Sequence, residues 1–172
     1  MRMPKKVNYV LGVEFSPDGK FLVVHDADFA LYSTRDWKHV GSLEGFAGDC
    51  VTFSPSSDRI AYRIPNGMRI AELPSLKTVI ETGESAGACP AVFSPDGRWF
   101  AAAFAHGINL FRLETGEQVA SLYFFGDDDW LVVTSSGLFD GTPGAWSQLA
   151  WRFSDSTFDL SLIHISPATR LL

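Results

Sequence analysis

The stretch Phe15-Ser16-Pro17-Asp18-Gly19 recurs unchanged as Phe93-Ser94-Pro95-Asp96-Gly97. A third copy, Phe53-Ser54-Pro55-Ser56-Ser57-Asp58, lies between them and has lost the glycine. The copies begin 38 and 40 residues apart. Proline presets the first corner of a turn, aspartate can hydrogen-bond its own backbone, and glycine accepts a positive φ. Each copy therefore predicts a tight turn that follows a strand.

Short apolar runs surround each of these turns at equivalent places. Four short strands in about 40 residues are typical of one antiparallel sheet, and a repeat of that period is typical of β-propeller blades. The first two strands of each repeat are apolar on both faces, as expected for sheets buried between neighbours. The strands that we expect are 51–53 before a turn, 21–24, 59–62 and 99–104 after it, then 30–32, 68–73 and 108–113, and finally 39–43, 77–80 and 118–123.

We therefore predict an all-β chain that forms a partial β-propeller, with about three four-stranded antiparallel blades and part of a fourth. The blades are expected over 7–45, 46–84 and 85–125, followed by a partial blade and closing segment over 126–159. Residues 131–134 read as another inner strand. A short helix is predicted near 143–151, running on toward Arg152, because Thr142 suits an N-cap and Pro143 suits the first helical position.

The stretch 108–116, Ile-Asn-Leu-Phe-Arg-Leu-Glu-Thr-Gly, resembles the end of a WD40 repeat, whose third strand carries a Trp-Asp pair. In this chain the tryptophan position reads Tyr32, Ala71 and Phe111, and the aspartate position reads Ser33, Glu72 and Arg112. The Gly-His pair typical of that family is not evident either. The resemblance therefore implies WD40-like blades that lack the family's side-chain hydrogen-bond network and rely on packing.

The segment after residue 125 resembles the part that closes the propeller in large bacterial WD40 proteins, some of which continue into a caspase-like peptidase domain. This resemblance implies that the parent protein carries a regulatory or effector domain downstream, and that the chain is a fragment of it. Because stacked blades give a rigid platform for partners, we expect a non-catalytic repeat scaffold that mediates protein–protein interaction within that larger protein. The alternative is a propeller that gates or regulates a peptidase or hydrolase domain beyond this chain. The matching residues are Trp130, Val132-Val133-Thr134, Gly137, Phe139-Asp140-Gly141, Pro143 and Trp151-Arg152.

Composition and charge bear on the partners. The net charge is −6, and the only basic cluster is Lys5-Lys6, so we expect no nucleic-acid partner. No apolar run reaches the length of a signal peptide or a membrane span, which predicts a cytoplasmic chain without membrane contact if Met1 is the true start. Three and a half blades cannot close a ring, so we expect exposed blade edges and self-association besides a protein partner.

The histidines and serines give no catalytic arrangement. His25, His39, His106 and His164 are scattered, and none has a partner at metal-ligand spacing. Ser16 could be read as a nucleophile beside His25-Asp26. However, its equivalents recur in the other repeats, which favours a structural role, and no strand-to-helix elbow presents it. We expect no enzyme activity, no catalytic residue, and no cofactor or metal site.

The remaining candidates also have structural interpretations. Cys50 and Cys89 precede equivalent motifs and are interpreted as buried thiols rather than a disulfide or metal pair. The acidic run 127–129 lacks the ligand spacing of a calcium loop and is interpreted as a solvated turn. Trp37 and Trp99 are expected to pack, although a tryptophan at a loop tip could anchor a partner.

The last residues differ in character from the repeats. The stretch 160–166, Leu-Ser-Leu-Ile-His-Ile-Ser, followed by Thr169-Arg170, resembles the translation of a transposon-end sequencing adapter. This resemblance implies that residues 160–172 are a non-native tail. The alternative is a terminal strand or a short amphipathic segment. Sequencing of the native locus distinguishes the two, because an adapter does not continue in frame through these residues in the genome.

Overall fold

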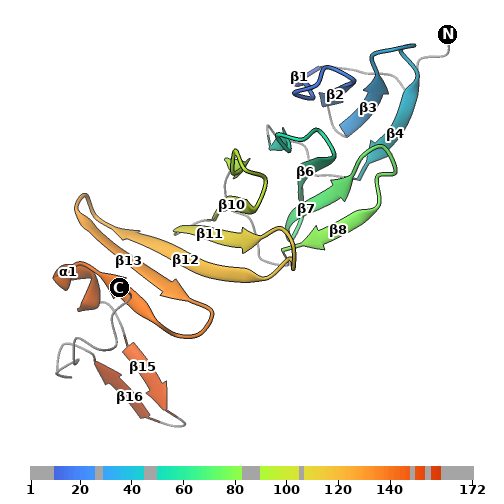
Figure 1. Ribbon diagram of the computed structural model, residues 1–172. Coiled ribbons are helices and arrows are strands. Elements are labelled where there is room, and N and C mark those ends of the chain that lie inside the picture. Colours follow the sequence, from blue (N-terminus) through green and yellow to red (C-terminus); the bar gives the residue numbers. More distant parts are fainter. Residues whose placement is uncertain are drawn as a thin grey trace.

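The computed structural model describes residues 10–25, 29–44, 50–82, 90–104, 107–147, 150–153 and 156–159. The chain is an all-β partial propeller whose sheets succeed one another along the chain (Figure 1). The elements are β1 (Gly12–Phe15), β2 (Phe21–His25), β3 (Phe29–Ser33), β4 (His39–Leu43), β5 (Val51–Phe53), β6 (Arg59–Ile64), β7 (Gly67–Glu72), β8 (Thr78–Glu81), β9 (Ala91–Phe93), β10 (Trp99–Phe104), β11 (Gly107–Arg112), β12 (Gln118–Phe125), β13 (Asp129–Thr134), β14 (Phe139–Gly141), α1 (Pro143–Trp146), β15 (Ala150–Phe153) and β16 (Ser156–Asp159).

Three antiparallel four-strand meanders form the repeating blades. Blade 1 is β1-β2-β3-β4, blade 2 is β5-β6-β7-β8, and blade 3 is β9-β10-β11-β12. The register is equivalent in all three, so that Leu31 opposite Gly41 corresponds to Ile70 opposite Ile80 and to Leu110 opposite Ala120. Each blade also shifts its register once between its third and fourth strands. The repeat that the sequence predicts is therefore a structural repeat.

The third sheet continues beyond blade 3. Residues 131–134, expected as the inner strand of a fourth blade, belong to β13, which pairs with β12, with Leu122 opposite Val132. β14 then adds a sixth strand. Gly126 has a φ of 59°, a conformation that glycine adopts at little cost, so the chain can reverse directly after β12. The tight turn makes a hairpin and keeps this segment on the same sheet.

The predicted helix is much shorter than expected. α1 covers only Pro143–Trp146, with Thr142 as its N-cap residue and proline at its start. The hydroxyl of Ser147 donates to the Gly144 carbonyl at 2.6 Å, a local bond that competes with continuation of the helix. The expectation of a helix toward Arg152 is wrong, because β15 begins at Ala150 and pairs with β16.

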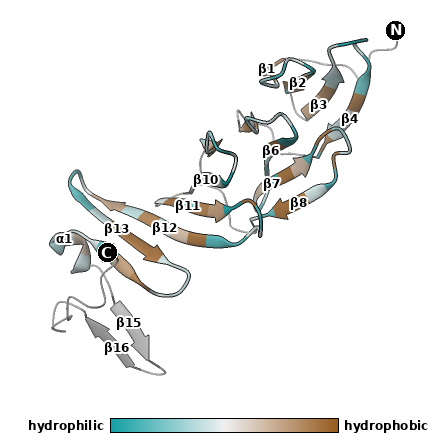
Figure 2. Cartoon of the chain, viewed as in Figure 1, coloured by the Kyte–Doolittle hydropathy of each residue, from teal (hydrophilic) through white to brown (hydrophobic). Residues whose placement is uncertain are grey.

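Blade 2 buries both of its faces. We call the side of a blade toward the preceding blade its front and the side toward the following blade its back. Ile60 and Tyr62 on the front of β6 pack with Val23 and Leu31 of blade 1. On the back, Ile70 belongs to a cluster with Phe100 and Phe111 of blade 3. Figure 2 shows the hydrophobic colouring along the strands that contribute to these layers. Because successive side chains of a strand point to opposite faces, an apolar strand such as β6 contributes to the layers on both sides of its sheet.

The added hairpin has a small core of its own. Leu131 and Phe139 on β13 and β14 pack with Ala145 of α1, and Phe125 and Trp146 border them. The hairpin is therefore held to the end of blade 3 both by strand pairing and by the helix.

Packing between blades predicts a large effect of one truncation. Ile70→Ala should lower the free energy of unfolding by about 2 to 5 kcal/mol, because the fully buried side chain leaves a cavity between blades 2 and 3. Val79→Ala, at an exposed position on the neighbouring strand β8, should cost less than about 0.5 kcal/mol. Urea unfolding followed by circular dichroism measures both, and equal losses would contradict packing as the main stabilising term.

Candidate functional site

The repeated serines use their hydroxyls within the turns. Ser94 Oγ donates to Asp96 Oδ1 at 2.6 Å and accepts the backbone N–H of Trp99 at 2.9 Å. Ser16 Oγ makes the corresponding bonds with Asp18 at 2.8 Å and with the Phe21 N–H at 2.9 Å. One serine–aspartate pair thus closes each turn and joins it to the second strand.

The degraded copy in blade 2 keeps the same arrangement with different residues. Ser54 Oγ donates to Asp58 at 2.8 Å and accepts the Arg59 N–H at 3.0 Å. Ser57 stands at the glycine position with a φ of 60°. Its hydroxyl accepts the backbone N–H of Asp18 at 3.0 Å, so the replacement forms a bond between blades 1 and 2. Hydroxyl–carboxylate bonds thus close each of the three turns, and a bond from a backbone N–H to a hydroxyl joins the turns of blades 1 and 2.

The turn carboxylates have low pKa values. Hydrogen bonds from Ser94 and Arg98 lower the pKa of Asp96 to about 2. Hydrogen bonds from Lys20 and Ser16 hold the pKa of Asp18 well below its usual range. Glu14 behaves in the opposite way, since burial between blades raises its pKa. The aspartates are therefore bound in their charged form, as structural acceptors.

The histidine and cysteine candidates lie apart. His25 is buried at the end of β2, 5.7 Å between ring centroids from Phe29, whereas His39 on β4 lies edge-on to Tyr32. His106 and His164 lie outside the described residues. Within the ranges given above, no group of three His, Cys, Asp or Glu residues could hold a metal ion.

Cys50 corrects one expectation. It is buried but disulfide-bonded, so its interpretation as a free thiol is wrong. The other cysteine of the sequence, Cys89, lies outside the described residues. Sequence spacing carried no information on the distance between the sulfur atoms, which decides whether a disulfide can form.

The strongest candidate site is a cleft that the sequence did not indicate. It has a volume of about 500 Å³ and lies at the turn end of blade 3, where blade 2 contributes Arg59. We call it the arginine cleft. Its lining consists of Arg59, Gly97, Arg98, Trp99, Arg112, Leu113 and Glu114.

Local contacts hold each arginine of this cleft. Arg59 Nη1 donates to the Leu113 carbonyl at 3.2 Å, which joins blades 2 and 3. The Arg112 guanidinium lies 5.5 Å from the centre of the Trp99 ring. Arg98 Nε contacts Asp96 at 2.6 Å, and its side chain is largely exposed. Each guanidinium has five N–H donors, so these contacts leave donors that can face a ligand.

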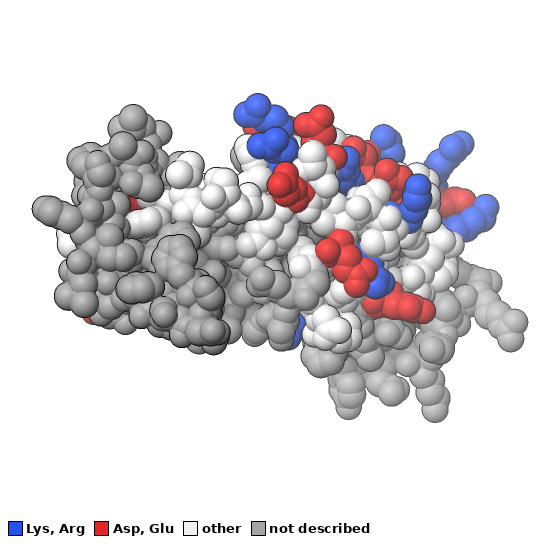
Figure 3. Space-filling view, turned by 90° about the horizontal axis from the view of Figure 1, so that it is seen from below, with Lys and Arg blue, Asp and Glu red and all other residues white. Residues whose placement is uncertain are grey.

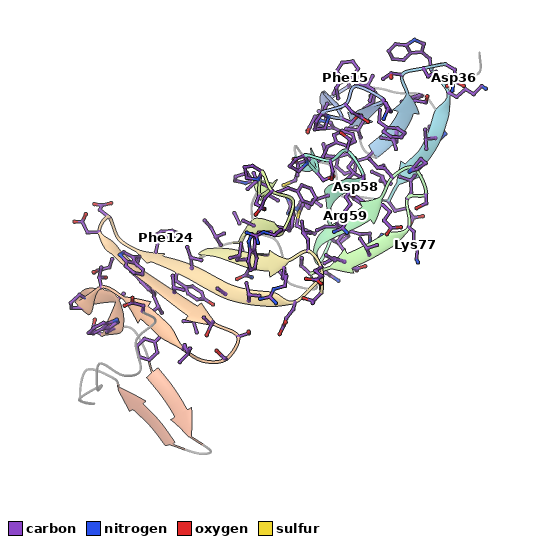
Figure 4. All side chains as sticks on the ribbon, in the orientation of Figure 1. Phe15, Asp36, Asp58, Arg59, Lys77 and Phe124 are labelled. Atoms are coloured by element: carbon purple, nitrogen blue, oxygen red, sulfur yellow. The ribbon has the colours of Figure 1, made fainter. Side chains whose placement is uncertain are left out.

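The cleft concentrates positive charge locally. Three arginines and one carboxylate, Glu114, line it, and Asp96, which contacts Arg98, offsets part of the positive charge. Figure 4 places Arg59 beside Asp58, next to blade 3. The face seen in Figure 3 shows basic and acidic residues side by side. Residues 59, 98 and 112 are distant in sequence, so a search for clustered basic residues could find only Lys5-Lys6, which lies outside the described part.

Comparison with known proteins supports the fold alone. No family model and no curated protein matches the chain. Among solved structures, it is similar to the crystal structure of the computationally designed Ika4 protein, with a TM-score of 0.53 and 11% identity. The match covers 81% of this chain and 98% of that one. In the described part of the chain, no helix is long and apolar enough to cross a membrane.

The low pKa of Asp96 predicts how one substitution changes acid stability. A group whose pKa is lower in the folded than in the unfolded chain stabilises the fold above its unfolded pKa, near 4 for aspartate. That contribution is lost as the pH falls through the folded pKa of about 2. Asp96→Asn should therefore destabilise the fold at neutral pH. Between about pH 4 and pH 2 the wild type should lose more stability than the variant, because only the wild type has this carboxylate to protonate.

Thermal melts at several pH values measure this difference. Asp128→Asn is the matched control, because Asp128 is exposed in the β12–β13 turn and belongs to none of the serine–aspartate turns. Parallel acid profiles for wild type and Asp96→Asn would show that the carboxylate does not stabilise the turn.

Proposed function

We propose that this chain is a non-catalytic interaction scaffold that docks an acidic segment of a protein partner in the arginine cleft. The observation that carries the proposal is the convergence of Arg59, Arg98 and Arg112 beside Trp99 in one cleft. A volume of about 500 Å³ is within the usual range for a binding pocket.

The chemistry of the cleft favours carboxylates. Guanidinium groups are planar and can hold a carboxylate through two parallel hydrogen bonds. The Trp99 ring supplies a flat apolar wall beside Arg112 and a surface for an apolar side chain of the same segment. Glu114 would repel a carboxylate placed next to it, so it restricts where the acidic groups can lie.

The use of the other polar groups supports a scaffold over an enzyme. The recurring serines donate their hydroxyl protons to turn aspartates whose pKa is lowered. A carboxylate of low pKa is a weak base, so these pairs suit a structural turn rather than an activated nucleophile. Stacked sheets form a rigid support on which turn residues keep their positions. Such a support suits recognition of a partner by pre-placed side chains.

Peptide binding tests this proposal. A fluorescent octapeptide of glutamate should bind, and the matched glutamine octapeptide should not. Arg98→Gln and Arg112→Gln should each raise the dissociation constant of the glutamate peptide by about 10-fold. This corresponds to the loss of one charged hydrogen bond of roughly 1.4 kcal/mol. Added salt should weaken binding because the contacts are exposed.

The control for charge alone is Arg35→Gln, which removes an exposed arginine from blade 1 and should leave binding unchanged. An equal loss with Arg35→Gln would show attraction by net charge rather than by the cleft. Tighter binding of a single-stranded oligonucleotide than of the glutamate peptide would show that the partner class is wrong.

A further inference from the structure

The two end blades each leave one apolar face open. On the front of blade 2, Val51 and Phe53 are 9% and 6% exposed because blade 1 covers them. The residues at the same places on blade 1 are Val13 and Phe15, and they are 58% and 56% exposed. The front of blade 1 therefore has the side chains of a buried layer and nothing from the described chain against it.

The back of blade 3 is open in the same way. Leu31 and Ile70, on the backs of blades 1 and 2, are fully buried. Their counterpart on blade 3, Leu110, is only half-buried, as are its neighbours Ile108 and Leu122. The apolar face continues onto the hairpin, where Phe124 is 58% exposed. In Figure 4 Phe15 and Phe124 lie toward opposite ends of the array.

At each junction between neighbouring blades, two residues of complementary size contact each other. A residue with positive φ in the turn before the fourth strand meets the outer strand of the blade before it. Leu76 of blade 2, with a φ of 57°, lies against Gly41, where a Cβ would collide with the leucine side chain. Gly116 of blade 3, with a φ of 72°, lies against Ile80. A large residue thus meets a small one at each junction. The following blade supplies the large residue between blades 1 and 2, and the preceding blade supplies it between blades 2 and 3.

Trp37 is the residue at this place in blade 1. It has a φ of 53°, which is unfavourable for a residue with a side chain, and it is 53% exposed. The matching place on the outer strand of blade 3 is Ala120, opposite Leu110 as Gly41 is opposite Leu31. The front of blade 1 thus carries a large residue, Trp37, at this place, and the back of blade 3 carries a small one, Ala120.

We propose that the back of blade 3 binds the front of blade 1 of a second copy of this chain, with Trp37 of one copy over Ala120 of the other. The contact continues the layer that already joins blade 1 to blade 2 and blade 2 to blade 3. It joins different surfaces of the two copies, so copies add head to tail and give a closed ring or an open chain. This inference does not rest on the arginine cleft. Trp99 and Arg112 of that cleft lie on the same face of blade 3 as Leu110, so a second copy and an acidic segment would compete for this part of the face.

Two single substitutions test the contact without damaging the blades. Trp37→Gly relieves the positive φ and copies Gly116, so the protomer should fold at least as stably. Ala120→Ile copies Ile80 at the same place of its strand. Each should raise the dissociation constant of self-association by about 10-fold or more, the first by removing an aromatic anchor and the second by a clash with Trp37.

The combination of the two gives the decisive result. The double variant recreates at the junction between copies the glycine–isoleucine pair that Gly116 and Ile80 form within the chain. Association should return in the double variant, and also when the two single variants are mixed, since each mixed junction pairs compatible residues. Sedimentation velocity across a dilution series measures the association, with circular dichroism as the check on folding and Val79→Ala as the control.

Three results would overturn the proposal. The first is a wild-type chain that remains monomeric at every concentration. The second is an association that neither single variant weakens, and the third is a double variant as weak as the singles.

Discussion

The structure depends on one interaction, the flat packing of each sheet against the next. A single four-stranded antiparallel sheet has two faces, and blade 2 shows that both can be apolar, since Ile60 faces blade 1 and Ile70 faces blade 3. Hydrogen bonds of the meander complete each sheet but do not cover its faces. Burial of those faces therefore supplies the driving force that joins the repeats, as in other arrays in which each unit contacts mainly its neighbours.

Two local features keep the sheets in the correct mutual position. The serine–aspartate pairs fix the turns between first and second strands, and the one altered copy adds a direct bond, from the Asp18 N–H to Ser57. The positive-φ residues before the fourth strands fit the outer strand of the preceding blade. Leu76 adopts an unfavourable backbone conformation, and its contact with Gly41 offsets that cost. At the same place Trp37 has a positive φ and is 53% exposed, and this difference from Leu76 is the basis of the proposed contact between copies.

The arginine cleft follows from the same stacking. Where blades 2 and 3 stack, Arg59 of blade 2 reaches the Leu113 carbonyl of blade 3. On blade 3 the Arg112 guanidinium lies over the Trp99 ring.

The sequence by itself determined the strands and turns of the blades, because these depend on nearby residues: the Ser-Pro-Asp-Gly motif fixes a turn, and alternation fixes which side chains share a face. It could not settle the place of 131–134, which read equally well as the first strand of a new blade and as the return of a hairpin after Gly126. Nor could it end α1 at Trp146, where a single hydroxyl, that of Ser147, competes with the helix. Only the tertiary structure gathered Arg59, Arg98 and Arg112. Only it showed that Val13 is exposed and Leu110 half-buried, whereas their counterparts in blade 2 are buried. Both depend on how whole sheets stack, and stacking joins residues that no local pattern relates.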